Sequence, residues 1–239
     1  MKPLLISSIC LYMFGSSNRL LLAAGAAAEV VYLGMRGLSL GRLPLLGPHD
    51  TLAFFSASIG VMALATAFSP ALAGKKWFGT ASGMAAGFFA LFALLFPASA
   101  MPLPQILDTL WFEAHVVLAF FAYALFAVGA LLCAGYLGQG ERSLLELQYR
   151  TALTGWSFFS ASMLAGGIWG YYAWGTYWLW TPKELWTSIL WIFYALFLHL
   201  RLKGTRWDRL AAWLGIAGFF VMLFTYLGVS MLMKSSHSF

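Results

Sequence analysis

Four histidines and a concentration of tryptophans are the side chains of this sequence best suited to holding a ligand. The histidines are His49, His115, His199 and His237. Six of the eleven tryptophans fall between Trp169 and Trp191, interleaved with Gly and Tyr. Neutral imidazole binds metals, and indole offers a flat apolar surface with one polar N–H group. Aromatic residues are normal at a membrane interface, but this density exceeds one or two rings per helix end.

The composition requires membrane-spanning helices to position these side chains. Charged residues make up 9% of the chain and hydrophobic residues 62%, whereas soluble proteins carry about 25% and 45–50%. A spanning helix needs about 20 mostly apolar residues, and such stretches follow one another along the sequence. The net charge of +6 is spread over short connections, which excludes a basic patch of the kind that binds nucleic acid. The two cysteines form no CxxCH motif, so the chain is not itself a c-type cytochrome.

Charged residues, Gly and Pro divide the sequence into about eight predicted transmembrane helices. The predicted ranges are 3–14, 18–36, 52–73, 79–97, 113–137, 152–172, 185–203 and 209–231. Since the first range is short, seven helices is the alternative. The predicted fold class is therefore an all-α, polytopic integral membrane helical bundle, which forms a single membrane domain over residues 1–239.

The distribution of Lys and Arg predicts the orientation of this bundle. Nine basic residues fall on one set of connections and five on the other, and the richer set is expected to be cytoplasmic. Both termini are then extracytoplasmic, and so is the Trp-rich segment, defined here as residues 166–186. The connection at 138–150 becomes cytoplasmic and is expected to hold a short interfacial helix.

This orientation predicts three histidines near the outer surface and one deep in the bundle. His115 begins a predicted helix, and His237 lies two residues from the end of the sequence. His49 is expected to be a solvated residue of the loop before the third helix. His199 follows Trp186 by 13 residues, which places it about 20 Å below the outer end of its helix.

A flat polyaromatic ligand with charged edges suits the predicted outer surface. Haem is one such ligand, because its rings stack on Trp and Tyr, its iron takes neutral imidazole and its propionates pair with Lys or Arg. A quinone is another, with a weaker requirement for histidine. Lys183 and Arg42 are candidate propionate contacts, although charges at a helix start or an interface are also ordinary. Arg36, like Arg42, is expected to anchor the chain at the outer leaflet.

The sequence resembles the CcsA/ResC-type cytochrome c assembly proteins, which carry a tryptophan-rich "WWD" signature. These proteins belong to a wider haem-handling family that includes CcmC- and CcmF-type members. The resemblance lies in five stretches that follow the family's order: GRLPLLGPHDTLAFFS (41–56), EAHVVLAFFAYALFAVGALLCAGYL (113–137), AWGTYWLWTPKELW (173–186), YALFLHLR (194–201) and TYLGVSMLMKSSHSF (225–239).

This resemblance implies that the protein binds haem b and presents it on the extracytoplasmic side of a cytoplasmic (inner) or thylakoid-type membrane. Together with a CcsB/ResB-type membrane partner, such a protein would form a holocytochrome c synthase that attaches haem to the CxxCH motif of apocytochrome c. It also implies that His115 and His237 ligate an outer haem and that His199 belongs to a second, intramembrane haem site. The implied haem platform consists of Trp169, Trp174, Tyr177, Trp178 and Trp180.

Two residues depart from the family pattern. Thr181 stands where the signature has Asp, which removes a negative charge beside the platform but leaves a hydroxyl that can cap the following helix. Glu29 stands where CcsA-type proteins have a histidine in an early helix. An ionisable residue within a membrane span indicates function, so Glu29 is a candidate iron ligand, cation partner or proton site.

Two other functions remain open at the level of the sequence. The first is a haem-binding regulator or chaperone that resembles HemX-like proteins and does not attach haem. The second is a membrane subunit of a redox complex that uses b-type haem or quinone. The sequence assigns no catalytic residue in any of these cases.

Overall fold

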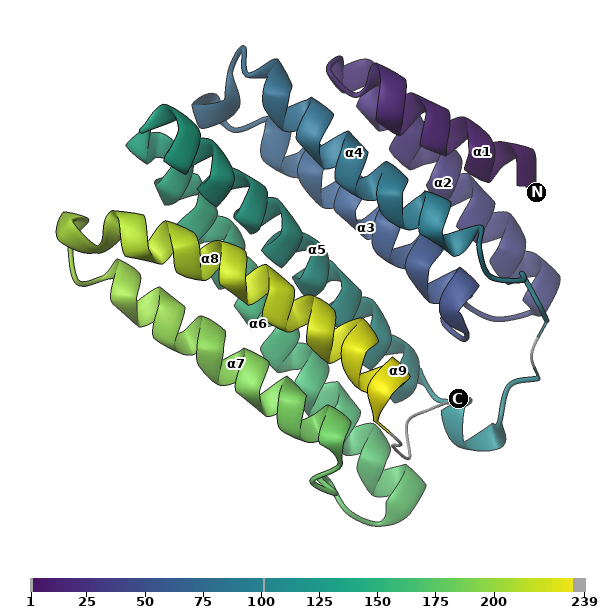
Figure 1. Ribbon diagram of the computed structural model, residues 1–239. Helices are drawn as coiled ribbons and strands as arrows, with labels where there is room; N and C mark the ends of the chain where they lie inside the picture. The colour runs from purple at the N-terminus through teal and green to yellow at the C-terminus, as the bar shows by residue number, and fades with distance from the viewer. Residues whose placement is uncertain (1, 101, 234–239) are drawn as a thin grey trace. The chain divides into compact units, whose positions relative to one another are not determined.

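The computed structural model describes residues 2–100 and 102–233, and this part of the chain is helical without any β-strand (Figure 1). The chain divides into two compact units, Met1–Leu103 and Pro104–Phe239, and each is described by itself. The predicted all-α class is therefore confirmed for the described residues.

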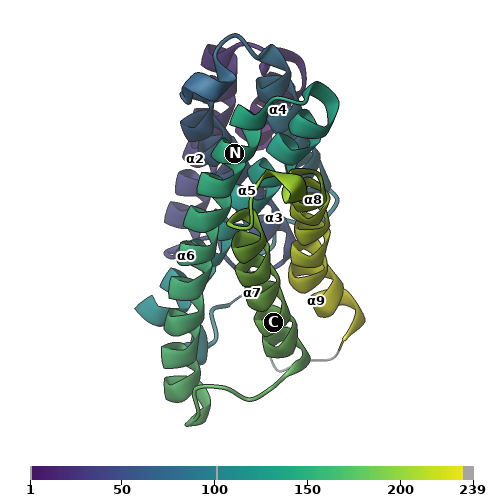
Figure 2. The same cartoon turned by 90° about the vertical axis from the view of Figure 1, so that its left-hand side faces the viewer.

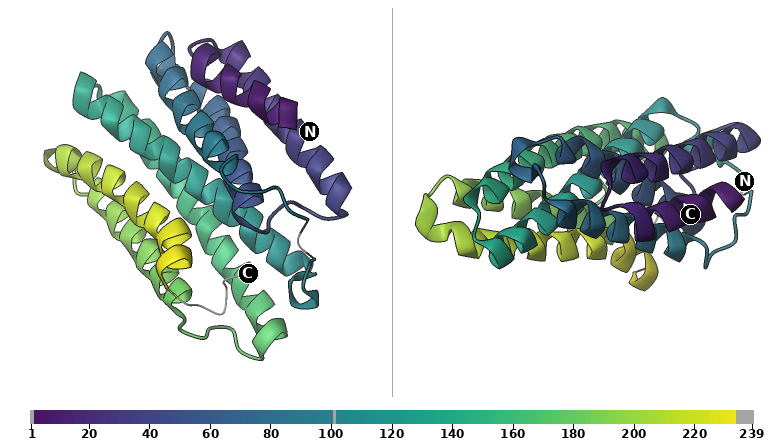
Figure 3. Two further views of the ribbon diagram at one scale, coloured as in Figure 1. Left: turned by 45° about the vertical axis from the view of Figure 1, so that its right-hand side comes forward. Right: turned by 90° about the horizontal axis from the view of Figure 1, so that it is seen from above.

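Unit 1 is built from four helices joined by short connections. It contains α1 (Lys2–Cys10), the π-helical turn η1 (Leu11–Gly15), α2 (Arg19–Leu40), α3 (Pro48–Ala67), the 3-10 turn η2 (Pro70–Leu72) and α4 (Lys76–Ala93). Successive helices α2, α3 and α4 pack side by side, and α1 with η1 lies against α2 and α4 (Figures 1 and 3). The chain direction therefore reverses at each connection, so the end of α2 meets the start of α3.

Unit 2 has the same up-and-down arrangement. It contains the 3-10 turn η3 (Gln105–Leu107), α5 (Leu110–Gln139), α6 (Arg142–Trp174), α7 (Pro182–Arg201), the 3-10 turn η4 (Thr205–Trp207), α8 (Asp208–Leu223), the π-helical turn η5 (Phe224–Gly228) and α9 (Val229–Leu232). Helices α5 and α6 pair along their length, α8 packs against α5, and α7 packs against both α6 and α8 (Figures 1 and 2).

Four helical stretches in the described residues are long and apolar enough to cross a membrane. They are Arg19–Leu40, Pro48–Ala67, Leu110–Gln139 and Thr205–Leu232. Each of the other predicted ranges also overlaps a helix. The predicted count of about eight spanning helices and the predicted outer location of both termini stay predictions.

The predicted short interfacial helix within residues 138–150 is wrong. Gly140 ends α5 in the left-handed conformation, with φ of 73°. The next helix, α6, begins at Arg142 and continues without interruption to Trp174. Neither Gly nor Pro occurs between residues 142 and 154, so nothing in the backbone separates this stretch from the helix that follows.

An ion-pair network joins α6, α7 and α8 at the end of unit 2 where α6 and α8 begin and α7 ends. Arg201 donates to Asp208 at 2.6 Å and lies 3.6 Å from Glu146. Arg142 also pairs with Asp208, at 3.1 Å. These contacts hold together the end of unit 2 opposite to the Trp-rich segment.

Candidate functional site

The candidate site lies at the end of unit 2 where four helix ends come together. Helix α5 starts there and α6 ends there, and the chain then passes through a loop of residues 175–181 into α7. The short helix α9 lies at the same end and contacts α7 (Figures 1 and 2). The fold thereby gathers His115, the Trp-rich segment and the last described turn of the chain.

Both ends of the loop at 175–181 are fixed by helix caps. Gly175 takes φ of 73° and donates its N–H to the carbonyl of Tyr171, which ends α6. At the other end, Thr181 Oγ1 accepts from the N–H of Glu184, while Glu184 Oε2 accepts from the N–H groups of Thr181 and Leu179. The predicted capping role of the Thr181 hydroxyl is therefore confirmed, and the full reciprocal capping box is present.

Trp180 lies in this loop with a strained backbone. Its φ of 56° makes it the one non-glycine residue with positive φ in the described part of the chain. This conformation costs an L-residue about 1–2 kcal/mol, and such strain tends to be retained at functional sites. The Trp180 side chain is 71% exposed, so the strained backbone presents an indole outward instead of burying it.

The predicted platform residues fall into a buried and an exposed group. Trp169 is only 3% exposed, and its indole N–H donates to the carbonyl of Ile106 at 2.8 Å. The Trp174 ring lies 4.8 Å from it in an edge-on contact. By contrast, Tyr177 and Trp180 are exposed. Trp169 is therefore packed inside unit 2, while the loop residues form the accessible aromatic surface; the platform role of all five residues stays a prediction.

Tyr177 and Trp178 complete this accessible surface. The Tyr177 ring stacks on Tyr171, with centroids 4.8 Å apart and planes 17° apart. Trp178 is half-buried and lies edge-on to Trp180, with centroids 6.5 Å apart. The stacked pair extends the loop surface onto the last turn of α6.

His115 lies on the second turn of α5, where it is tied to α6. Its Nδ1 lies 2.8 Å from the carbonyl oxygen of Ser162, and the Ser162 hydroxyl donates to the carbonyl of His115 at 2.7 Å. Because a carbonyl oxygen can only accept, the first contact is a hydrogen bond only when Nδ1 carries the proton. In the neutral imidazole Nε2 then holds the lone pair, and no described residue makes a hydrogen bond to it. This arrangement fits an imidazole that binds a metal through Nε2.

Gly166 makes room for the His115 ring. A Cβ atom at Gly166 would lie 2.6 Å from Nδ1 and 2.9 Å from Cε1 of His115. These separations are too short for any side chain other than hydrogen, so α5 and α6 can hold the imidazole here only around glycine. Trp169 lies one turn further along the same face of α6, with its ring 5.4 Å from that of Phe112 on α5.

The start of α7 is linked to the C-terminal part of the chain. Lys183 Nζ donates to Ser230 Oγ at 2.7 Å, and the ring of Trp186 lies 4.5 Å from that of Phe224. The chain beyond Met233, including His237, lies outside the described residues. The predicted ligand role of His237 therefore stays a prediction, as does a propionate contact for Lys183.

His199 lies far from this site within unit 2. It occupies the last turn of α7, which begins at Pro182, and is therefore about 25 Å along the helix axis from the loop at 175–181. Its side chain is exposed, and Nδ1 contacts the carbonyl of Ala195 at 2.7 Å. No second intramembrane ligand lies beside it in the described part of unit 2.

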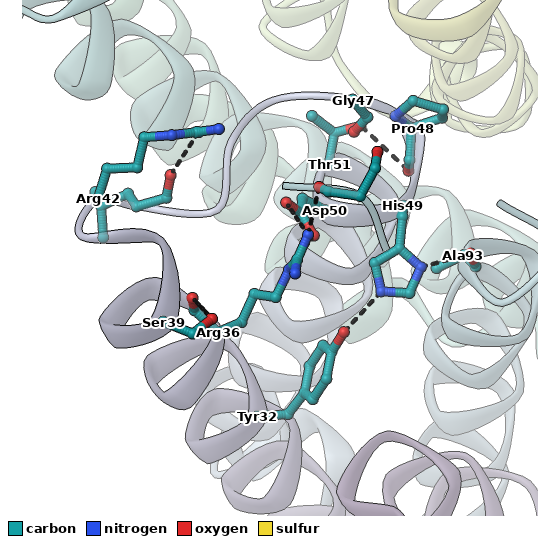
Figure 4. Close-up of polar contacts among 12 residues, drawn as sticks. Tyr32, Arg36, Ser39, Arg42, Gly47, Pro48, His49, Asp50, Thr51 and Ala93 are labelled. Atoms are coloured by element: carbon teal, nitrogen blue, oxygen red, sulfur yellow. Dashed lines mark hydrogen bonds and ion pairs between the residues drawn. The ribbon is translucent and has the colours of Figure 1, made fainter. Parts of the chain in front are cut away.

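The predictions for His49 and Arg36 are wrong, because both side chains are buried in unit 1 (Figure 4). His49 is the second residue of α3, and its imidazole bridges the hydroxyl of Tyr32 and the carbonyl of Ala93, at 2.6 and 2.9 Å. Arg36 forms a two-pronged ion pair with Asp50, at 2.9 and 3.2 Å. These residues hold the end of α2 to the start of α3.

Arg42 and Glu29 also belong to unit 1. Arg42 is half-buried and donates weakly to the carbonyl of Leu43, at 3.4 Å (Figure 4). Glu29 is fully buried within the bundle, beside Ser56 of α3. The intramembrane position and the function of Glu29 stay predictions, as does a propionate contact for Arg42.

Similarity to known proteins identifies the family. A model of the family described as "Cytochrome C assembly protein" matches residues 47–237. A "Cytochrome c biogenesis protein CcsA" of Chlamydomonas reinhardtii is 31% identical over 95% of this chain and 67% of its own length. Proteins of the same name from Synechococcus sp. (strain RCC307) and Prochlorococcus marinus (strain MIT 9515) are 27% and 32% identical, over 92% and 54% of this chain and 84% and 53% of their own lengths. The chain belongs to the cytochrome c assembly protein family.

Proposed function

We propose that this protein binds haem b as a substrate and presents it on the extracytoplasmic side of the membrane for attachment to apocytochrome c. Membership of the cytochrome c assembly family supports the general role. The proposal of haem binding rests on the orientation of His115. The hydrogen bond from Nδ1 of His115 to the carbonyl of Ser162 leaves Nε2 available to the haem iron.

The loop at 175–181 would supply the surface on which haem lies. Tyr177 and Trp180 are exposed, and the Tyr171–Tyr177 stack continues the flat surface onto α6. Rigid aromatic rings bury much apolar area at a small cost in conformational entropy. The caps at Gly175 and Thr181 reduce this cost further, because the loop backbone is ordered before haem arrives.

Other residues at the same end of unit 2 supply the remaining proposed contacts with haem. Lys183 supplies a positive charge for a propionate, and Ser230 keeps that charge directed toward the C-terminal part of the chain. His237 would supply the second ligand of the haem iron. His199 stays the proposed ligand of a separate intramembrane haem, without an assigned second ligand.

In this function the chain positions haem, and the thioether bond forms between haem and the apocytochrome. The protein would hold a vinyl edge outward, where a thiol of the CxxCH motif adds across the vinyl double bond to form a thioether. The membrane would be a cytoplasmic or thylakoid-type membrane, and a CcsB/ResB-type protein would be the partner. The chain's own contribution is binding, orientation and electrostatics.

Co-expression tests the proposal. The protein would be produced with a CcsB/ResB-type partner and an apocytochrome c in a host without its own assembly system, and covalent haem would be measured on a denaturing gel. We expect covalent cytochrome with the wild-type protein and little with His115→Ala, because the iron loses its ligand. An apocytochrome with both CxxCH cysteines replaced by Ala serves as the control. Equal covalent haem with wild type and His115→Ala would contradict the proposal.

Thr181 favours a second candidate function. A carboxylate at this position could contact both haem and the loop, whereas Thr181 serves only as the cap of α7 in this structure. The alternative is a haem-binding regulator that is similar to HemX-like proteins. In the same co-expression experiment it predicts extractable haem on the protein and no covalent cytochrome.

A further inference from the structure

Unit 1 contains a fully buried carboxyl group at a point where three helices and a π-helical turn converge. Glu29 of α2 has zero exposure. Ser56 of α3 lies 3.0 Å from Glu29 Oε2 and 2.8 Å from the carbonyl oxygen of Ala86 on α4, each distance measured from Ser56 Oγ. The fourth neighbour is Tyr12 of η1, whose hydroxyl lies against Gly60, one turn after Ser56 on α3.

The Ser56 contacts indicate which group carries a proton. A serine hydroxyl has one hydrogen, and the Ala86 carbonyl can only accept. If Ser56 donates along its shorter contact, to Ala86, its remaining contact with Glu29 Oε2 is a hydrogen bond only when the carboxyl group is protonated and donates. A neutral Glu29 is therefore the state in which both contacts of Ser56 can be hydrogen bonds at the same time.

The Tyr12 side chain packs between helices at positions where glycine leaves space for it. Its ring is fully buried and lies where Gly25 of α2 and Gly60 of α3 carry no side chain. A Cβ atom at Gly60 would collide with the Tyr12 hydroxyl. This packing directs a proton-bearing group toward the buried carboxyl.

The site contains unused hydrogen-bonding capacity. Neither the Tyr12 hydroxyl nor Glu29 Oε1 has a hydrogen-bond partner of good geometry among the described residues. No Lys or Arg forms an ion pair with Glu29 in the described part of the chain, and Arg36, the buried arginine of α2, is already paired with Asp50. An ionised carboxylate without a partner is costly within an apolar bundle.

We propose that Glu29, Ser56 and Tyr12 form a buried site that binds one exchangeable proton. The proton resides on Glu29, donates to Ser56 and is exchanged beside the Tyr12 hydroxyl. The other titratable or charged groups on the helices packed around Glu29 are Arg19, Tyr32 and Arg36 of α2, His49 and Asp50 of α3, Lys76 of α4, and Lys2 and Cys10 of α1. The three residues of the site all belong to unit 1.

Infrared spectroscopy of the full chain in lipid tests this site. A protonated carboxylic acid gives a C=O stretching band separate from the amide and carboxylate bands. We expect this band at neutral pH in the wild-type protein, a downward shift after transfer to D₂O, and its loss in Glu29→Gln. Tyr12→Phe should retain the band at an altered frequency, because the neighbouring hydroxyl is gone.

Folding and ion controls make the result decisive. Glu29→Gln replaces one neutral group by another of similar shape, so its thermal unfolding in detergent should match that of the wild-type protein. The absence of a carboxylic acid band that depends on Glu29 would overturn the proposal. Loss of the band on addition of Na⁺, but not of K⁺, would also overturn it, because the site would then bind a metal cation instead of a proton.

Discussion

Gly166→Ala is expected to reduce haem binding sharply, whereas Gly167→Ala is expected to leave it nearly unchanged. The new methyl group at position 166 would lie 2.6 Å from Nδ1 of His115, so the imidazole or α6 must shift. Displacing the residues that orient a metal ligand costs about 10-fold to 100-fold in affinity. The measurement is haem bound per protein, taken from the Soret absorbance of each purified variant.

Gly167→Ala is a matched control for this experiment. Both glycines lie in the interior of α6, so the gain in helix propensity on replacement by Ala is the same. A Cβ atom at position 167 would meet only the carbonyl oxygen of Tyr177, at an ordinary 3.5 Å. Equal haem retention by the two variants would show that the seating of His115 against α6 does not control binding.

Asp50→Ala is expected to destabilise the protein by about 3–5 kcal/mol, because it leaves the buried Arg36 without its partner. The two side chains are 7% and 3% exposed, and Arg36 also donates to the carbonyl of Ser99 at 2.8 Å. Loss of Asp50 therefore loosens the junction of α2 and α3 and the chain that follows α4. The measurement is the free energy of unfolding in mixed detergent micelles.

Two variants serve as controls for the ion pair. Glu146→Ala removes an acidic group whose side chain is 59% exposed and lies 3.6 Å from Arg201, and exposed pairs contribute only about 0–1 kcal/mol. The double variant Arg36→Met, Asp50→Leu removes both buried charges and should recover much of the lost stability. If Asp50→Ala were as mild as Glu146→Ala, the pair would not hold unit 1 together.

Helix positions followed from the sequence because apolar stretches and their breakers are local signals. Gly41 and Gly140 end α2 and α5 in the left-handed conformation, as the concentration of glycine at predicted connections indicated. The stretch at 142–150 was misassigned because its polar composition indicated an interfacial position, whereas helix continuity depends only on the absence of a breaker.

The site was predicted less completely, because pairings between distant residues are not local. Arg36 and Asp50 are 14 positions apart and meet only because the chain reverses between α2 and α3. His49 resembled a loop residue, yet it is buried by the helix that begins at Pro48. Trp169 is buried and Trp180 is exposed because the left-handed turn at Gly175 ends α6 between them. The loop that carries Trp180 therefore lies beyond the end of the helix.

The cap at Thr181 shows what a short motif can establish. A threonine followed three residues later by Glu184 is the sequence signature of a capping box, and both of its hydrogen bonds are present. The same motif does not predict which group contacts a ligand in place of the Asp carboxylate that the family signature has at position 181. Local structure was therefore predictable here and ligand chemistry was not.

Chemical rescue of His115→Gly tests haem ligation most directly. The purified variant would be examined by absorption spectroscopy with and without added imidazole, which can occupy the space that the side chain leaves. We predict that His115→Gly loses most of the Soret band of the wild-type protein and that imidazole restores it. A variant that keeps the wild-type band without imidazole, or a folded variant that imidazole does not restore, would contradict the assignment of His115 as a haem ligand.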